Sequence, residues 1–214
     1  MYKAIALAAA AQQVNALQVF RACQEPEVQQ NFDVEGYTGL WYEQRRDKEC
    51  RYESGICDTA HYSLKDDGNI RVRNNDANPE TGAWTGGEGY AFQVDPSKDD
   101  GYLKVKFVPF VPAGDYKVLS TDYDNYTVIY GCSGLPGLKY NTEYVWILTK
   151  EVNPTDDIIQ TALDVVATKI PLYDMSYLVP TPQGKGVLST GGDCDYDIAP
   201  NHEEISHEFI PLSQ

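Results

Sequence analysis

The stretch "NFDVEGYTGLWYEQRR", residues 31–46, begins as an acidic turn segment and continues as a strand-like run. Gly39 and Trp41 stand two positions apart at the head of that run. A glycine lets the backbone bend sharply, whereas a tryptophan is the largest side chain available to a core. The pair therefore predicts a sharp bend beside a buried aromatic, and gives Trp41 a structural rather than a catalytic role.

Outward from this stretch, the apolar residues between about residues 38 and 150 repeat with a period of two. In "NIRVRN" (69–74) and "YLKVKF" (102–107) they alternate with arginine or lysine, which predicts half-buried antiparallel strands. Turn sequences such as "DDGN" (66–69) separate the segments, giving eight consecutive strands with short connections. Because the basic residues face water, strand parity places these residues inward: Ile70, Val72, Asn74, Leu103, Val105 and Phe107. The glycine-containing strand "GYAFQV" (89–94) is left without assigned faces.

One amphipathic helix follows the strands. Asn153 is its expected N-cap, and Pro154 suits the first helical position. A short ninth strand is expected near residues 175–179. Together these elements predict an all-β protein, an eight-stranded antiparallel up-and-down β-barrel with one C-terminal α-helix packed outside, wide enough for one small ligand. The helix should pack on the strands "YTVIYG" (126–131) and "EYVWILT" (143–149) through an apolar stripe of Ile159, Leu163, Val166 and Ile170.

The charge and the N-terminus indicate where the protein works. A formal charge of -15 over 214 residues argues against nucleic acid or an anionic membrane as a partner. Residues 1–16 have one basic residue, an Ala-rich apolar run and small residues at the end, which is typical of a signal peptide. An ordinary first helix is the alternative. We therefore expect a secreted protein, or one of the secretory-pathway lumen, with a barrel domain at 17–195 and an acidic tail at 196–214.

The five cysteines agree with an oxidising compartment. They are far apart and lack the CxxC spacing of zinc or redox sites, and the chain has only three histidines. Two disulfides and one odd thiol are therefore expected, with no metal site and no cofactor.

Three segments in register resemble the lipocalins, most closely the apolipoprotein D-like lipocalins. They are "GLW" (39–41), the "TDY" of Thr121, Asp122 and Tyr123, and "YVWILTKE" (144–151) before the helix. The resemblance implies that Trp41 plugs the closed end of the barrel and that Lys150 lies over its ring, where arginine is usual in the family. It also implies the disulfides Cys23–Cys132 and Cys57–Cys194. Cys50 is then left over in the loop after the first strand, either without a role or pairing between chains.

The resemblance further implies a function. The expected function is to bind and carry a small hydrophobic ligand such as a fatty acid, sterol, retinoid or pigment-like molecule. Two alternatives stay open, a protein-interaction module with a filled barrel and a lipocalin-type isomerase or de-epoxidase. No catalytic residue is expected, because the odd thiol lies in a loop, no histidine falls on an assigned inward face and Glu43 is read as a structural acid. The positions that match the family's pocket are Tyr62, Asn74, Phe107, Tyr116, Trp146 and Leu148.

Two surface features complete the sequence. Asn125 begins an acceptor sequon, Asn-Tyr-Thr, at a turn of the closed end, and is a candidate for glycosylation. The segment "FVPFVPAG" (107–114) is apolar where a loop should be polar. It is either a lid over the barrel or an exposed tip that docks on a neutral lipid particle or a protein. The docking residues would be Phe110, Val111, Leu135 and Leu138.

Overall fold

The computed structural model of the chain describes residues 18–19, 22–50, 53–134 and 141–197. The expected signal peptide, Leu135, Leu138 and most of the acidic tail lie outside the described residues. The elements are β1 (Gln18–Val19), β2 (Gly39–Asp47), β3 (Ile56–Leu64), β4 (Ile70–Ala77), β5 (Trp84–Gln93), η1 (Pro96–Lys98), β6 (Tyr102–Lys106), β7 (Gly114–Thr121), β8 (Tyr126–Gly134), β9 (Asn141–Thr149), α1 (Asp156–Lys169), η2 (Met175–Tyr177) and β10 (Leu178–Pro180).

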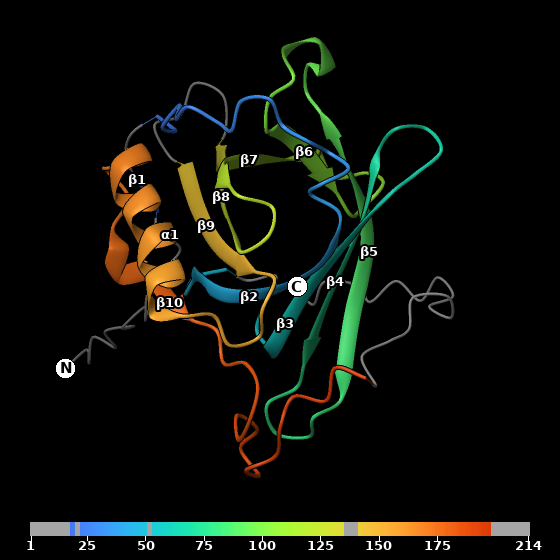
Figure 1. Cartoon of the computed structure of the whole chain (residues 1–214), viewed down its shortest axis with the longest axis vertical. Coiled ribbons are helices and arrows are strands. Elements are labelled where there is room, and N and C mark those ends of the chain that lie inside the picture. The colour runs from blue at the N-terminus through green and yellow to red at the C-terminus, as the bar shows by residue number, and fades with distance from the viewer. Residues whose placement is uncertain (1–17, 20–21, 51–52, 135–140, 198–214) are drawn as a thin grey trace, which may run out of the picture.

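Strands β2 to β9 form a closed barrel (Figure 1). Each strand pairs antiparallel with the next, and β9 pairs back onto β2. This confirms the expected eight-stranded up-and-down barrel. The short strands β1 and β10 extend it by pairing with β9 and β2. The strand expected at 175–179 is shorter and later, because residues 175–177 form a 3₁₀ turn in which the Asp174 carboxylate accepts from the Ser176 backbone N–H.

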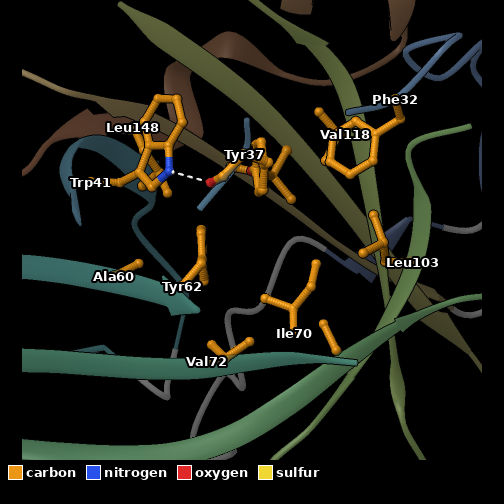
Figure 2. Close-up of a cluster of buried hydrophobic side chains, with 12 residues drawn as sticks. Phe32, Tyr37, Trp41, Ala60, Tyr62, Ile70, Val72, Leu103, Val118 and Leu148 are labelled. Atoms are coloured by element: carbon orange, nitrogen blue, oxygen red, sulfur yellow. Dashed lines mark hydrogen bonds between the residues drawn. The ribbon is translucent and has the colours of Figure 1, made fainter. Parts of the chain in front are cut away.

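The barrel interior holds the main core (Figure 2). Ile70, Val72 and Leu103 are 1–3% exposed within this cluster, and Val105 packs against it. Arg71 and Arg73 occupy the opposite face of β4, where both pair with Glu88. Strand parity was therefore a correct guide to the inner face of β4 and β6.

Helix α1 packs on the outside of β8, as expected, and also on β7, and it shares a buried cluster with Val145 and Ile147 of β9. Val166 and Ile170 of the expected stripe are fully buried, as is Ala162. The N-cap prediction was wrong, because Thr155 and not Asn153 precedes the first helical residue. The Thr155 carbonyl accepts from the N–H groups of Ile158 and Ile159, so the helix begins after Pro154. Within the described residues, no helix is long and apolar enough to cross a membrane.

The closed end of the barrel is built around Trp41 (Figure 2). Its side chain is 0% exposed, and the indole N–H donates to the Tyr37 carbonyl at 3.0 Å. The Lys150 ammonium lies 4.0 Å from the centroid of the Trp41 ring and donates to the Thr38 carbonyl at 2.8 Å. Gly39 has a φ of +97°, a conformation that favours glycine. The arrangement expected for this end is present.

The "TDY" segment shapes the turn between β7 and β8. The Thr121 hydroxyl donates to the Tyr126 carbonyl at 2.8 Å, and the Asp122 carboxylate accepts from the backbone N–H groups of Asn125 and Tyr126. The Tyr123 hydroxyl accepts from the Asp33 N–H at 3.0 Å. The turn therefore holds the N-terminal segment across the closed end.

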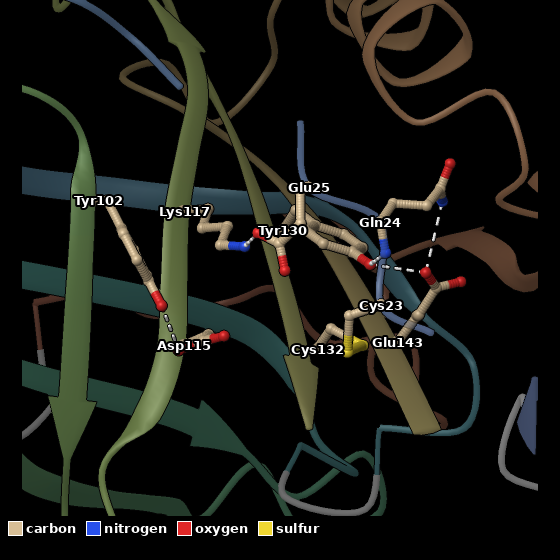
Figure 3. The surroundings of a disulfide bond; sticks show 9 residues. All are labelled: Cys23, Gln24, Glu25, Tyr102, Asp115, Lys117, Tyr130, Cys132 and Glu143. Atoms are coloured by element: carbon tan, nitrogen blue, oxygen red, sulfur yellow. Dashed lines mark hydrogen bonds and ion pairs between the residues drawn. A yellow bond between two sulfur atoms is a disulfide. The ribbon is translucent and has the colours of Figure 1, made fainter. Parts of the chain in front are cut away.

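Two disulfides join the termini to the barrel. Cys23–Cys132 ties the N-terminal segment to β8 (Figure 3), and Cys57–Cys194 ties the C-terminal segment to β3. These are the pairs that the family resemblance implied. Cys50 is in neither disulfide and is buried in the segment between β2 and β3.

The C-terminal segment also enters the barrel wall. β2 and β3 pair only from Gly39 to Tyr42 on the β2 side, and beyond that point β10 pairs with residues 45–47. The Cys57 N–H donates to the Pro182 carbonyl at 2.9 Å. Residues 178–182 therefore lie between β2 and β3 toward the open end of the barrel.

Candidate ligand-binding site

The six residues predicted to bind ligand lie on the inner face of the barrel. Tyr62 and Leu148 belong to the inner core cluster, and Tyr116 and Trp146 pack against it. Asn74 shares the face of Val72 on β4, and Phe107 follows β6 in phase with Leu103. The fold thus brings together side chains from β3, β4, β7, β9 and the end of β6.

Two glycines of β5 give Phe107 its place. Gly87 pairs with Asn74 and Gly89 with Val72, so both glycines face inward. A Cβ at Gly89 would lie 2.8 Å from Cδ1 of Phe107, and one at Gly87 would lie 3.9 Å from the same atom. A Cβ at Gly89 would also lie 2.5 Å from the Lys106 carbonyl oxygen, so a side chain at Gly89 would displace the backbone after β6 as well as the Phe107 ring. The faces of this strand were not predicted from the sequence and neither glycine was identified, although their spacing of two was the available signal.

The site is closed below and open above. Tyr62 and Leu148 are 4% and 5% exposed, whereas Phe107 is 37% exposed. Beneath the mouth, a cavity of about 10 Å³ remains, which is enough for about one water molecule. The lower half of the barrel is thus filled by its own side chains. The residues that line this small cavity are Tyr37, Tyr62, Ile70, Val72, Ala91, Leu103 and Tyr116.

A row of hydroxyl groups forms the polar part of the floor. The Tyr116 hydroxyl is 2.9 Å from the hydroxyls of both Tyr62 and Tyr37, and the Tyr37 hydroxyl is 3.1 Å from that of Thr127. Burial raises the pKa of Tyr62 and of Tyr116 well above the usual value. These groups therefore stay neutral and act as hydrogen-bond donors and acceptors for one another.

A charged network lies toward the open end, centred on Arg46. One terminal guanidinium nitrogen, Nη1, is 3.0 Å from both Glu43 Oε1 and Asp58 Oδ2. The other, Nη2, donates to the Gly55 carbonyl at 2.8 Å. On the far side, Glu53 Oε2 accepts from the Trp146 indole N–H at 2.6 Å. The network joins the segment after β2 to a residue of the predicted ligand site.

Two acids of this network, Asp58 and Glu43, have raised pKa values. Burial raises the pKa of Asp58 to about 7, against the opposing effect of Arg46 and with support from Glu53 and Asp76. Burial also raises the pKa of Glu43, and the charges of Glu53 and Asp58 raise it further. The Thr181 hydroxyl, brought in by the C-terminal segment, donates to Glu43 Oε1 at 2.5 Å.

Glu43 was predicted from the sequence to be a structural acid, but its partners were not predicted. A β-bulge between Glu43 and Arg45 changes the alternation of β2, so Arg46 and not Arg45 opposes Trp146. A second irregularity precedes Thr59 in β3, where Cys57 has a φ of +60°. Strict alternation from the sequence could not place these charges inside the barrel.

Comparison with known proteins agrees with the fold. A family model described as "Lipocalin-like domain" matches residues 32–183. Apolipoprotein D of Mus musculus is 40% identical over 126 residues, which cover 59% of this chain and 65% of that protein. The chain thus spans less than two thirds of that relative's length. The Lazarillo protein of Schistocerca americana is 33% identical over 135 residues, covering 63% of each chain.

Solved structures show the same architecture. Insecticyanin from the tobacco hornworm Manduca sexta superposes with a TM-score of 0.71 at 22% identity, covering 81% of this chain and 93% of that one. Lobster apocrustacyanin A1 gives a TM-score of 0.65 at 20% identity, covering 84% and 94%. At these identities the likeness concerns the fold, and the family model and the sequence relatives carry the assignment: the chain belongs to the lipocalin family.

Proposed function

We propose that this lipocalin binds a small hydrophobic ligand in the upper half of its barrel and carries it outside the cell or in the secretory-pathway lumen. One observation carries the proposal. Asn74, Tyr116 and Trp146 face inward yet are only partly buried, and Phe107 is 37% exposed. Inward-facing side chains with exposed surface mean that the mouth of the barrel is accessible, above a floor of tightly packed aromatic residues.

The energetics suit a reversible carrier. An apolar ligand that buries about 300 Å² gains about 7 to 8 kcal/mol before the cost of association. Affinity on the micromolar scale follows. Fatty acids, sterols, retinoids and pigment-like molecules are the candidate ligands.

The disulfides support a secreted protein. Each closes more than a hundred residues, with sequence separations of 109 and 137, and such bonds persist in oxidising compartments. Carriage of a ligand through the extracellular medium is consistent with this chemistry.

We favour binding over catalysis because neither His61 nor Cys50 is among the side chains that line the accessible interior, and the acids of the Arg46 network are paired with the protein's own groups. His61 alternates with the inward-facing residues Ala60 and Tyr62 and so points outward from β3. Cys50 is buried in the segment after β2, with its thiol 3.4 Å from Glu53 Oε2. An isomerase or de-epoxidase would need such groups beside the bound ligand.

The experiment that tests the proposal is a ligand titration followed by tryptophan quenching, with retinoids, sterols and fatty alcohols. Trp146→Ala should weaken binding by about 1 to 3 kcal/mol, because it removes a large apolar contact, while the barrel still folds. Trp84→Phe is the matched control, since Trp84 packs on the outside against Tyr196. Absence of saturable binding by the parent protein would favour the filled-barrel interaction module.

The apolar loop supports a proposal about the partner. Phe110 is 98% exposed and Val111 is 50% exposed, so these side chains extend into solvent and do not cover the barrel. We propose that they dock the mouth on a neutral lipid particle, because the net charge of -15 disfavours an anionic surface. A Phe110→Ser, Val111→Ser protein should float less with neutral lipid particles while its ligand affinity is unchanged. Unchanged flotation would reject docking.

A further inference from the structure

The charged groups of the Arg46 network share the interior with the proposed ligand site. Across the β2–β9 pair, Glu43 lies opposite Leu148 and Arg46 opposite Trp146. Asp58 is placed beside Arg46 by their 3.0 Å contact, and Asp76 lies on the face of Asn74 in the regularly paired part of β4. A ligand that contacts Asn74 and Trp146 therefore meets this network.

The network has more acids than bases. Four carboxylates, those of Glu43, Glu53, Asp58 and Asp76, act on one another electrostatically, and Arg46 is the cation among them. Both terminal nitrogens of Arg46 are engaged, one with two carboxylates and the other with the Gly55 carbonyl. Arg46 is thus committed to the protein's own groups and is poorly placed to bind an anionic ligand.

The other described cations close to the barrel also point elsewhere. Lys150 lies over Trp41 at the closed end and donates to Thr38. Arg73 and Lys104 pair on the outer surface with Glu88 and Asp115. Within the residues that the structure describes, a ligand carboxylate at the mouth would therefore lie beside buried acids without a cation to neutralise it.

Burial adds to the cost of placing a ligand carboxylate beside these acids. Glu43 and Asp58 are 4% and 5% exposed, and the same loss of water that disfavours their ionised forms acts on any other carboxylate brought beside them. Any acid of the network that is ionised repels a ligand carboxylate more strongly inside a protein than it would in water. The direction of both effects is against an anionic head group.

The site instead offers hydrogen-bond acceptors. Asn74 Oδ1 is buried and has no hydrogen-bond partner among the described residues. Together with the carboxylate oxygens, it can accept from a hydroxyl or an ammonium group. No set of three or more His, Cys, Asp or Glu side chains in the described residues is arranged to hold a metal ion.

We propose that the barrel selects apolar ligands whose head group donates hydrogen bonds, an alcohol or an amine, and discriminates against carboxylates. This specificity rests on the proposed function, since it requires that a ligand occupies the mouth of the barrel. Glu53 and Asp58 are the specificity-determining residues: Glu53 because it contacts Trp146, and Asp58 because it shares Arg46 with Glu43. Among the candidate ligands, the proposal favours retinol and sterols over retinoic and fatty acids.

The test uses three ligands that differ only in head group. Dodecylamine, dodecanol and dodecanoate compete with the neutral fluorescent probe N-phenyl-1-naphthylamine at about pH 8, below their micelle concentrations. The amine and the alcohol should displace the probe, and dodecanoate should bind at least about tenfold more weakly than the amine. Equal affinities, or tighter binding of dodecanoate, would overturn the selectivity while leaving the carrier function in place. Failure of the probe and of all three ligands to bind would instead refute the proposed function.

Charge-removing variants locate the selectivity. Glu53→Gln keeps a carbonyl oxygen to accept from Trp146, and Asp58→Asn keeps the side-chain shape, so each should bring the affinity of dodecanoate closer to that of the amine. Glu88→Gln removes the same charge from the outer face of the neighbouring strand β5 and should change nothing. The roles of Glu53 and Asp58 would be overturned if the ratio of dodecanoate affinity to dodecylamine affinity is unaltered in both Glu53→Gln and Asp58→Asn, with circular dichroism showing that both variants are folded.

A pH series gives a second readout that a purely structural role would not change. Acidification from about pH 8 to about pH 6 protonates Asp58, whose pKa is about 7, so the negative charge of the network falls. Dodecylamine stays protonated throughout this range. The ratio of its affinity to that of dodecanol should therefore fall in the parent protein on acidification, and it should change less in Asp58→Asn. A constant ratio of the two affinities across this pH range would contradict an electrostatic origin of the selectivity.

Discussion

Lys150 stabilises the closed end of the barrel, and its removal gives a sharp test of the structural reasoning. The ammonium group lies 4.0 Å from the Trp41 ring centroid and donates to the Thr38 carbonyl at 2.8 Å. A cation over an indole ring contributes about 0.5 to 2 kcal/mol, and a hydrogen bond from a charged donor about 1.5 to 3 kcal/mol. Because Lys150 is only partly buried, solvent weakens both contributions, and we expect a total of about 2 to 3 kcal/mol.

Lys150→Met is the suitable change, because it keeps an unbranched apolar chain over the ring and removes the charge and the donor. Urea unfolding under non-reducing conditions, followed by tryptophan fluorescence, measures the free energy of unfolding. With a slope of about 2 kcal/mol per M, a loss of about 2 kcal/mol lowers the midpoint by about 1 M. Lys150→Arg should retain most of the stability, since a guanidinium can stack on the ring and still donate to Thr38.

Lys106→Met is the control, because Lys106 lies on the outer face of β6 and its loss should change the free energy by less than about 0.5 kcal/mol. If Lys150→Met and Lys106→Met have the same midpoint, the contact over Trp41 contributes no net stability. The reasoning about the closed end would then be wrong, although the fold would be unaffected.

Three further predictions concern the stability and modification of the chain. Replacing Cys57 and Cys194 by serine opens a loop with a sequence separation of 137 and should lower the free energy of unfolding by up to about 5 kcal/mol; a urea midpoint equal to the parent's would contradict it. The pKa of Asp58 is raised to about 7 in the folded protein, so its stabilising contribution is lost as the pH rises through 7. The melting temperature should therefore be higher at about pH 6.5 than at about pH 8, and a difference just as large in Asp58→Asn would assign the effect elsewhere. Asn125 is exposed at the closed end, so protein secreted from eukaryotic cells should carry a glycan there, and an unchanged mass in Asn125→Gln beyond the substitution itself would exclude it.

The sequence by itself determined the architecture of the barrel. The alternation of apolar and basic residues around Ile70 and Leu103 is local, and each strand must bury the same face whatever its partners are. The Gly39 and Trp41 pair likewise marks a bend beside a buried aromatic side chain, because a positive φ and a large apolar side chain are requirements of single positions. The place of Trp41 at the closed end came from the family resemblance. The disulfide pairing came from the family resemblance and not from the spacing of the cysteines.

The boundaries of the helix depended on the tertiary structure. Asn153 and Thr155 are both acceptable N-caps by residue type, and Pro154 is compatible with either. In the structure the helix begins after Thr155, and the first helical hydrogen bonds run from the N–H groups of Ile158 and Ile159 to the Thr155 carbonyl. Residue preference could not decide between the two positions.

Only the tertiary structure decided the chemistry of the barrel mouth. The bulge in β2 brings Arg46 inward in place of Arg45, and a bulge has no strong local sequence signal, because it depends on how β2 pairs with β9. Thr181 reaches Glu43 because the C-terminal segment enters between β2 and β3, a contact across 138 residues of sequence. Alternation along a strand fixes which way a side chain faces in regular pairing, whereas irregular pairing and distant segments determine which charges meet inside the barrel.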